Sequence, residues 1–499
     1  MLSYDFKEPQ RNFRCGSCRL VPLPNHCEVQ RPRLCLQIPC RLIKNKSTKL
    51  GTEPITKLLF AQAAPASVGI LVMSLNILVD TIFVGNWIGS NAIAAINVVL
   101  PVSFFIAALG MAVGIGGSSI VSRALGASDL SLARRTVANQ VLLTLCITVT
   151  MVVLGLTFQD QLVVAFGGKG DIFDYASTYY RIVLYGVPVL ALSMMGNTII
   201  RAEGAPRHAM IAMIIPSVTN LIMDYVLINK LGMGMEGAAW ATTTSYVFCF
   251  SYIAYYFVRF SSLMPLLREL RFNTSVLAEI GSLGGVTLAR QAVVSVIYLI
   301  MNNILFDLDG EAGVAVFAIV GRMLMFALFP VFGVTQGFLP IAGYNYGAAQ
   351  YERVREVINK AMLWASIIAT LIFIGIFSFP RQIANLFVDD PQVLNLAPTA
   401  LRYVFMATPI IAVQLIGAAY FQAIGKAVPA FFLTLSRQGF IFIPLVLILP
   451  KFFGTLGVWL SFPIADASSS LITFLYLRYS LKRDAAMNNA TLELPKQAA

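Results

Sequence analysis

The sequence is poor in charged residues and nearly devoid of histidine. Only 12% of its 499 residues are charged, about half the share of an average soluble domain. Its two histidines lie in the N-terminal region (His26) and at a loop (His208). A histidine-ligated metal or a catalytic histidine inside the long apolar runs is therefore excluded. No Gly-x-Ser-x-Gly nucleophile motif appears in a suitable context either, so the sequence does not indicate an enzyme.

Apolar residues fill most of the chain. Hydrophobic residues make up 58% of the sequence, and the mean hydropathy is +0.76. Stretches of about 20 residues with few charges can cross a bilayer, and in lipid they must be helices because every backbone group needs an internal partner. The sequence predicts an all-α polytopic membrane protein with twelve such spans: 57–84, 91–119, 136–157, 179–200, 208–228, 237–258, 280–306, 314–338, 359–379, 400–421, 428–449 and 456–478.

The second half of the chain repeats the first at a nearly constant offset. Pro188 is matched by Pro409, and Gly204 by Gly425, both at an offset of 221 (409 − 188 and 425 − 204). Such a repeat predicts two pseudo-symmetric six-helix lobes, with a site in or between them. The predicted parts are a leader (1–50), an N-lobe (51–262), a cytoplasmic linker (263–278), a C-lobe (279–482) and a tail (483–499).

Loop charges predict the orientation in the membrane. Basic residues such as Arg134, Arg135 and Arg259 follow even-numbered spans, whereas acidic residues such as Asp160 and Asp309 follow odd-numbered ones. The positive-inside rule then places both termini in the cytoplasm, in a multi-pass protein of the cell (inner) membrane. The net charge of +12 fits an anionic inner leaflet, so no nucleic-acid partner is expected.

The first 45 residues differ from the rest. They hold five of the seven cysteines. A zinc site using Cys15-x-x-Cys18 is one interpretation, but the spacing of the later cysteines is irregular. We expect instead a disordered basic leader, or an upstream start that the cell does not use.

Two acidic residues lie within spans of the first half. Asp80 ends span one and Asp224 lies in span five, and each has an asparagine four residues before it, Asn76 and Asn220. A four-residue spacing puts each pair on one helix face. Ionisable groups in a membrane are costly and mark functional sites. Carboxylates with amide and hydroxyl neighbours, here Asn197 and Thr242, can bind Na⁺ or share protons.

The second half does not repeat these acids. Asn303 replaces Asp80, and the counterpart of Asp224 falls near Pro444. A purely structural role would more naturally appear in both halves, so we place the ion site in the first half. The alternative is that Asp80 caps a helix or pairs with a loop cation.

The remaining charges in the spans lie mostly in the second half. For Arg290, Arg322 and Arg437 we expect structural roles, because arginine can extend to water or bind a carbonyl group. Asp466 is an alternative second carboxylate for a proton or a substrate.

These features together resemble the MATE family of multidrug and toxic compound extrusion transporters, over residues 52–482. The motifs that carry the resemblance are Val79-Asp80-Thr81, Arg201-Ala202-Glu203-Gly204, Asn220-x-x-x-Asp224 and the two-lobe repeat. The resemblance implies a cavity between two six-helix lobes that opens alternately to either side, and export of organic cations driven by Na⁺ or H⁺ entry. It also implies an N-lobe cation site like that of the prokaryotic, DinF-like branch, at Asp80, Asn197, Asn220, Asp224 and Thr242, and Pro65 is similar to the family's helix-bending proline.

We therefore predict an antiporter without a cofactor, coupled to Na⁺ or H⁺ and expected to be monomeric. Sodium would bind at Asp80, Asn220, Asp224 and Thr242, with Asn76 beside them. Its partners are membrane lipid and small cationic or amphipathic substrates, and the candidate cavity residues are Phe104, Phe105, Met194, Met195 and Gln336. The alternative is a flippase for lipid-linked oligosaccharide, which would need a strongly cationic cavity.

Overall fold

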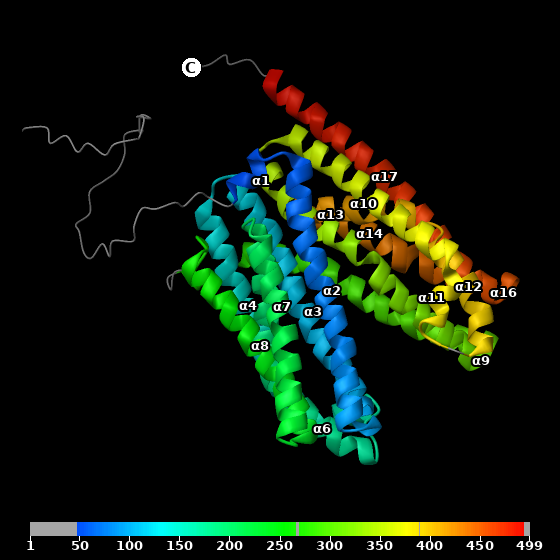
Figure 1. Cartoon of the computed structure of the whole chain (residues 1–499). Helices are drawn as coiled ribbons and strands as arrows, with labels where there is room; N and C mark the ends of the chain where they lie inside the picture. Colours follow the sequence, from blue (N-terminus) through cyan, green and yellow to red (C-terminus); the bar gives the residue numbers. More distant parts are fainter. Residues whose placement is uncertain (1–46, 266–268, 389, 494–499) are drawn as a thin grey trace, which may run out of the picture. The chain divides into compact units, whose positions relative to one another are not determined.

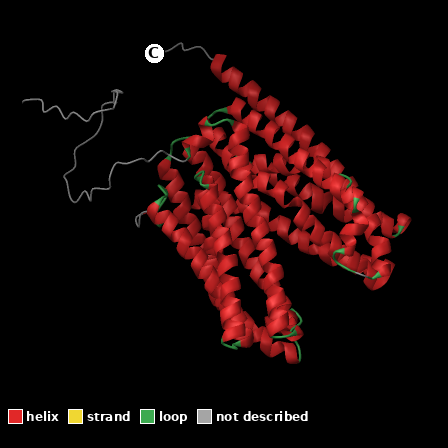
Figure 2. Cartoon of the chain, in the orientation of Figure 1, coloured by secondary structure: helices red, strands yellow, loops and turns green. Residues whose placement is uncertain are grey.

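The computed structural model describes residues 47–265, 269–388 and 390–493. The side chains of Ser90, Asp171 and 484–493 are not described. The cysteine-rich leader, including the alternative zinc site, lies outside the described residues. The described part is helical and contains no strand (Figure 2).

The helices of the first half form one bundle, in which α6 packs along both α3 and α8 (Figure 1). In chain order the elements are α1 (Thr48–Thr52), α2 (Ile55–Trp87), α3 (Ser90–Gly126), α4 (Leu130–Thr157), α5 (Gln159–Ala165), α6 (Asp171–Ala202), α7 (Pro206–Asp224), the π-helix η1 (Tyr225–Lys230) and α8 (Gly234–Arg259).

The second half begins with α9 (Thr274–Gly347). This run of helix is interrupted at Gly310, whose φ of +64° lies outside the helical region. Glycine reaches this conformation without steric cost, so α9 comprises two spans. The rest are α10 (Tyr351–Ser378), α11 (Pro380–Asn385), α12 (Pro391–Phe405), α13 (Thr408–Ala423), α14 (Ala427–Leu435), the π-helix η3 (Ser436–Phe442), α15 (Ile443–Ile448), α16 (Pro450–Phe453) and α17 (Thr455–Glu493).

The predicted all-α, twelve-span architecture is confirmed. Among the described residues, nine helices or helical runs are long and apolar enough to cross a membrane, and α12 with α13 form a tenth span bent by 47°. The break at Gly310 divides α9 into two spans. The twelfth is α8, which has 26 residues but is less apolar because it contains many tyrosines, threonines and serines.

The start of α2 packs against the second half of the chain. Leu58 and Ala63 share a buried core with residues of α9, α10 and α13. The amide of Asn345 donates to the backbone oxygen of Leu50 at 2.9 Å, and Arg353 donates to that of Glu53. The helix that carries Asp80 is therefore anchored to one half and extends into the other.

Glycines bring the two halves into backbone contact. A Cβ atom on Gly284 of α9 would lie 2.6 Å from the carbonyl oxygen of Ala112 in α3. A Cβ on Gly126 or on Gly347 would lie 2.0 Å from a carbonyl oxygen of the opposite helix. No side chain fits at these positions, so α3 and α9 approach as closely as backbones can.

Candidate functional site

The side chains of Asp80 and Asp224 meet between α2 and α7. Their carboxyl groups are close enough to form a hydrogen bond when one of them carries a proton. Asp224 is fully buried, and neither of its oxygens accepts a hydrogen bond from any described residue. Two carboxylates in one buried place repel each other, so the pair needs a cation or a proton to offset its charge.

One turn away, Asn76 and Asn220 connect the same two helices. The Asn76 Nδ2 donates to the Asn220 Oδ1 at 3.1 Å. The Asn76 Oδ1 and the Asn220 Nδ2 are buried without partners among the described residues. The four-residue spacing thus aligns two amides beside two carboxyls, and one amide oxygen stays free to accept a further bond.

Two tyrosines belong to this cluster and were missed by the sequence analysis. The Tyr179 hydroxyl in α6 lies 3.4 Å from the Thr242 Oγ1 in α8, and Tyr179 is an electrostatic neighbour of both carboxyls. Tyr246 of α8 is a neighbour of Asp80. Tyrosine in an apolar span carries no sequence signal, because packing alone explains it there.

The cluster thus offers oxygen ligands from four helices. Carboxyl, amide, threonine and phenol oxygens are the hard donors that alkali cations prefer, and the carboxyl pair can equally hold a proton. Directly after Asp224 the chain leaves the α-helix for the π-helix η1. Such π-helical turns often accompany functional sites.

Asn197 is not part of this cluster. Its Nδ2 donates to the backbone oxygen of Ala209 at 2.7 Å. Ala209 lies 15 residues before Asp224 in α7 (224 − 209), which is roughly 22 Å along a helix. The sequence could place Asn197 in span four, but it could not place it at the right depth.

The repeat seen in the sequence also appears in a comparison with known families. One family model, MatE, matches the chain twice, over residues 65–226 and 287–448. The chain belongs to the MatE family. The two matches start 222 residues apart (287 − 65), so each half is one copy of the family's unit. The resemblance drawn from the motifs is thus confirmed, and membership in the DinF-like branch stays a prediction.

Relatives of the MatE chain include transporters from bacteria and an archaeon. It is 25% identical to the multidrug export protein MepA of Staphylococcus aureus (strain MSSA476), over 85% of this chain and 93% of MepA. A structure described as MATE in the bent conformation has a TM-score of 0.84 and 28% identity, covering 89% of this chain and 99% of that one. A MOP superfamily transporter from Pyrococcus furiosus, described as having a binding pocket of reverse polarity, has a TM-score of 0.82 and 28% identity with the same coverage. These MatE relatives are membrane transporters, as is the present integral multi-pass protein.

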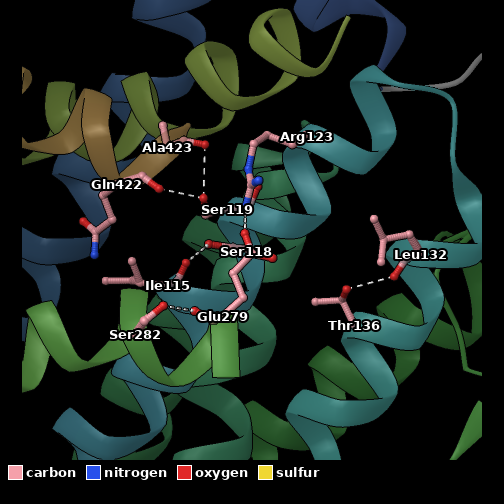
Figure 3. Close-up of polar contacts among 10 residues, drawn as sticks. All are labelled: Ile115, Ser118, Ser119, Arg123, Leu132, Thr136, Glu279, Ser282, Gln422 and Ala423. Atoms are coloured by element: carbon pink, nitrogen blue, oxygen red, sulfur yellow. Dashed lines mark hydrogen bonds and ion pairs between the residues drawn. The ribbon is translucent and has the colours of Figure 1, made fainter. Parts of the chain in front are cut away.

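Polar side chains join the two MatE halves beside the glycine contacts (Figure 3). Arg123 of α3 forms an ion pair of 2.5 Å with Glu279 of α9. The Ser119 Oγ donates to the backbone oxygens of Gln422 (2.6 Å) and Ala423 (3.1 Å) at the end of α13. This set of contacts, which we call the inter-lobe contact, links α3 to two helices of the other half.

The predicted cavity residues lie in different surroundings. Phe104 and Phe105 are both about half exposed. Phe105 lies seven residues before Ala112, and therefore on the α3 face that contacts α9. Gln336 lines a small cavity at the inter-lobe contact, about 20 Å³ in volume. Met194 is half-buried.

Met195 does not line the small cavity at the inter-lobe contact. It is 4% exposed, its sulfur lies 3.5 Å from the hydroxyl of Thr144, and it packs in the core of the first bundle. Adjacent methionines on one helix point to different faces, and the sequence could not show which face is which.

Pro65 lies within α2 where that helix meets α9. A Cβ on Gly333 would clash with Ser67, and one on Gly337 would lie 2.9 Å from the backbone nitrogen of Ala63. The proline thus lies between two close contacts to the second half, at Ala63 and Ser67, and before Asp80 on the same helix. A change in the direction of α2 at Pro65 would move Asp80 relative to that anchor.

Proposed function

We propose that the chain is a secondary antiporter that exports lipophilic or cationic compounds in exchange for Na⁺ or H⁺. The observation that carries the proposal is the buried Asp80–Asp224 pair, whose carboxyls have no cation within the described chain to balance them. Family membership and relatives named multidrug export proteins support the substrate class. The ion would bind at Asp80, Asp224, Asn220 and Thr242, with Tyr179 as a further ligand.

The charge of the pair provides the coupling. With no ion bound, the two carboxylates repel each other and favour separation of α2 from α7. Binding of Na⁺ or H⁺ removes the repulsion and allows the helices to approach around the Asn76–Asn220 bond. Exchange follows only if ion and substrate favour opposite states of the transporter, because a ligand shifts an equilibrium by its differential affinity.

The inter-lobe contact supplies the second element of alternating access. By the positive-inside rule, it lies on the cytoplasmic side, near Arg134 and Arg135 in the α3–α4 region. Closure there leaves the space between the lobes accessible from the outside, with Phe105 on its wall. Transport to the inside-open state requires the contact to break.

Efflux of ethidium from proteoliposomes tests the proposal. A Na⁺ gradient and a pH gradient are imposed separately on liposomes containing the purified chain. We expect one of them to drive efflux and thereby to name the coupling ion. Absence of efflux under both gradients, with folded and inserted protein, would reject the proposal.

Removal of one hydroxyl tests whether Tyr179 belongs to the ion site. In Tyr179→Phe the fold should persist, and the ion concentration for half-maximal efflux should rise about two- to tenfold, the value of one hydrogen bond. The measurement is the efflux rate against Na⁺ concentration or pH. Tyr185→Phe, on the same helix but with an exposed ring, is the matched control. An unchanged ion dependence in Tyr179→Phe would remove Tyr179 from the site.

The Arg123–Glu279 ion pair should contribute little to closure. Its side chains are 22% and 37% exposed, and such pairs are worth at most about 1 kcal/mol. Glu279→Gln should therefore shift the open–closed equilibrium by less than about fivefold. Distances between spin labels at Ser131 and Arg355, measured by double electron–electron resonance, report that equilibrium. Glu356→Gln, which breaks a pair within α10, is the control. A complete opening in Glu279→Gln would show that charge, and not packing, closes the contact.

A further inference from the structure

The C-lobe holds a buried ion pair between two of its own helices. The Arg437 Nε of η3 donates to the Asp466 Oδ1 of α17 at 2.5 Å, and the side chains are 14% and 6% exposed. Asp466 is thus neutralised by Arg437, which gives it a partner that the Asp80–Asp224 pair lacks. The alternative of Asp466 as a free second carboxylate is not what the structure shows.

A second arginine lies beside this pair. A Cβ on Gly439 of η3 would lie 3.7 Å from Val293 of α9, so the two helices pack closely there. Arg290 is one turn before Val293 on the same face of α9, and its charge acts on that of Arg437. Arg290 itself is only partly exposed.

The Arg290 side chain has no partner among the residues that the structure describes. Among the described residues, no hydrogen bond or ion pair involves its guanidinium, whereas Arg437 is paired with Asp466. Asp466 offsets the charge of Arg437, so the charge of Arg290 has no counterpart among the described residues. Arginine does not lose its proton in proteins, so the excess positive charge persists at membrane depth, where unpaired charge is costly.

Arg290 is partly exposed and lies near the inter-lobe contact along α9. It lies six residues after Gly284, where α9 touches α3, which is about 9 Å further along the helix. The next residue, Gln291, is exposed on the same face of α9 as Gly284. Arg290 thus lies beyond the inter-lobe contact and next to an exposed position of α9.

We propose that Arg290, with Arg437 nearby, binds the acidic group of an amphipathic molecule, a carboxylate or a phosphate. Asp466 holds Arg437 in place and is a positioning residue. Guanidinium groups bind such oxyanions with paired, charge-assisted hydrogen bonds. The two lobes then have opposite polarity, and zwitterionic or acidic amphiphiles join the cations as ligands. The acidic group belongs either to an exported compound or to a lipid headgroup.

Two dyes with one ring system test the proposal. Rhodamine 123 is a methyl ester, and rhodamine 110 is the corresponding free acid. The two dyes therefore differ at the carboxyl group that Arg290 is proposed to bind. Binding to the purified full chain is measured by fluorescence anisotropy. In Arg290→Gln we expect the affinity for the free acid to fall about tenfold or more, the value of a charge-assisted bond, with the ester unchanged. Arg290→Lys should recover part of the loss, since it keeps charge but not the planar fork.

Competition experiments identify the source of the acidic group, and a control variant tests whether the effect is specific to Arg290. Competition with the free acid by phosphatidic acid, in wild type and not in Arg290→Gln, would assign the site to a lipid headgroup. Its absence would assign the site to the exported compound. Arg402→Gln, another C-lobe arginine, should change neither dye. Equal binding of the free acid by wild type and Arg290→Gln, or an equal loss of both dyes, would overturn the proposal and leave Arg290 as a solvated side chain. The inference rests on the proposed transport function only for its biological role, because the binding assay is independent of any gradient and ester efflux tests that function separately.

Discussion

Asp224→Asn should abolish ion-driven efflux while leaving the protein folded. The substitution removes the charge that the coupling ion neutralises, so the free energy that links ion to substrate, typically 5–150-fold in affinity, is lost. The folded state should not suffer. Neither Asp224 oxygen accepts a hydrogen bond from a described residue, and a neutral amide in a buried place is less costly than a second carboxylate. Efflux from proteoliposomes and thermal unfolding in detergent measure the two effects.

The matched control for this variant is Asp174→Asn. Asp174 lies in the first turn of α6, where it is exposed. Its loss removes the same charge from the N-lobe but not from the site, and efflux should persist. Drug efflux at the wild-type rate in Asp224→Asn would refute the proposed ion site, and a fall in unfolding temperature would show that the carboxyl has a structural role instead.

Gly284→Val should prevent the lobes from closing at the inter-lobe contact. The added Cβ would lie 2.6 Å from the carbonyl oxygen of Ala112, and backbone atoms cannot yield as a side chain can. Overpacking of this kind costs about 1–3 kcal/mol. Closure would then be disfavoured by roughly 5–150-fold, and both the labelled distance between Ser131 and Arg355 and the efflux rate should report it.

The adjacent glycine provides the control. A Cβ on Gly285 meets no atom within 4 Å. Gly285→Val therefore adds the same side chain to the same turn of α9 without touching α3, and it should transport normally. If Gly284→Val and Gly285→Val behaved alike, the backbone contact between α3 and α9 would not be the closure that transport requires.

The helices could be predicted well because the bilayer imposes a length and a composition. The predicted spans 57–84 and 136–157 lie within α2 (Ile55–Trp87) and α4 (Leu130–Thr157). Apolar composition marks only part of each helix: α2 extends beyond its predicted span at both ends, and α4 extends beyond its own at the N-terminal end. The π-helices η1 and η3 could not be predicted, because no composition distinguishes a π-turn from the α-helix around it.

The ion site could be predicted in part. A carboxyl in an apolar span is costly, so Asp80 and Asp224 stand out from the sequence, and their pairing with asparagines follows from the helical repeat. Tyr179 gave no such signal. The predictions for Asn197 and Met195 were wrong for a different reason. The depth of a residue in the bundle and the direction of its side chain depend on the neighbouring helices and not on the sequence of its own helix.

The arginines of the C-lobe show a third limit. The sequence assigned Arg290 and Arg437 the same structural role, but within the described part of the chain only Arg437 of the two has a carboxylate partner. Pairing across spans 11 and 12 is a tertiary contact between residues 29 apart (466 − 437). Such contacts follow from how the helices pack, and the excess charge at Arg290 became visible only with them.

Ion movement driven by substrate is the most direct test of antiport. Proteoliposomes preloaded with ²²Na⁺ or with the pH dye pyranine receive external ethidium, with no ion gradient imposed. We predict that ethidium entry releases ²²Na⁺ or alkalinises the interior, in one of the two assays, and that Asp224→Asn abolishes the signal. Ethidium entry through the wild-type protein without movement of either ion would contradict the account.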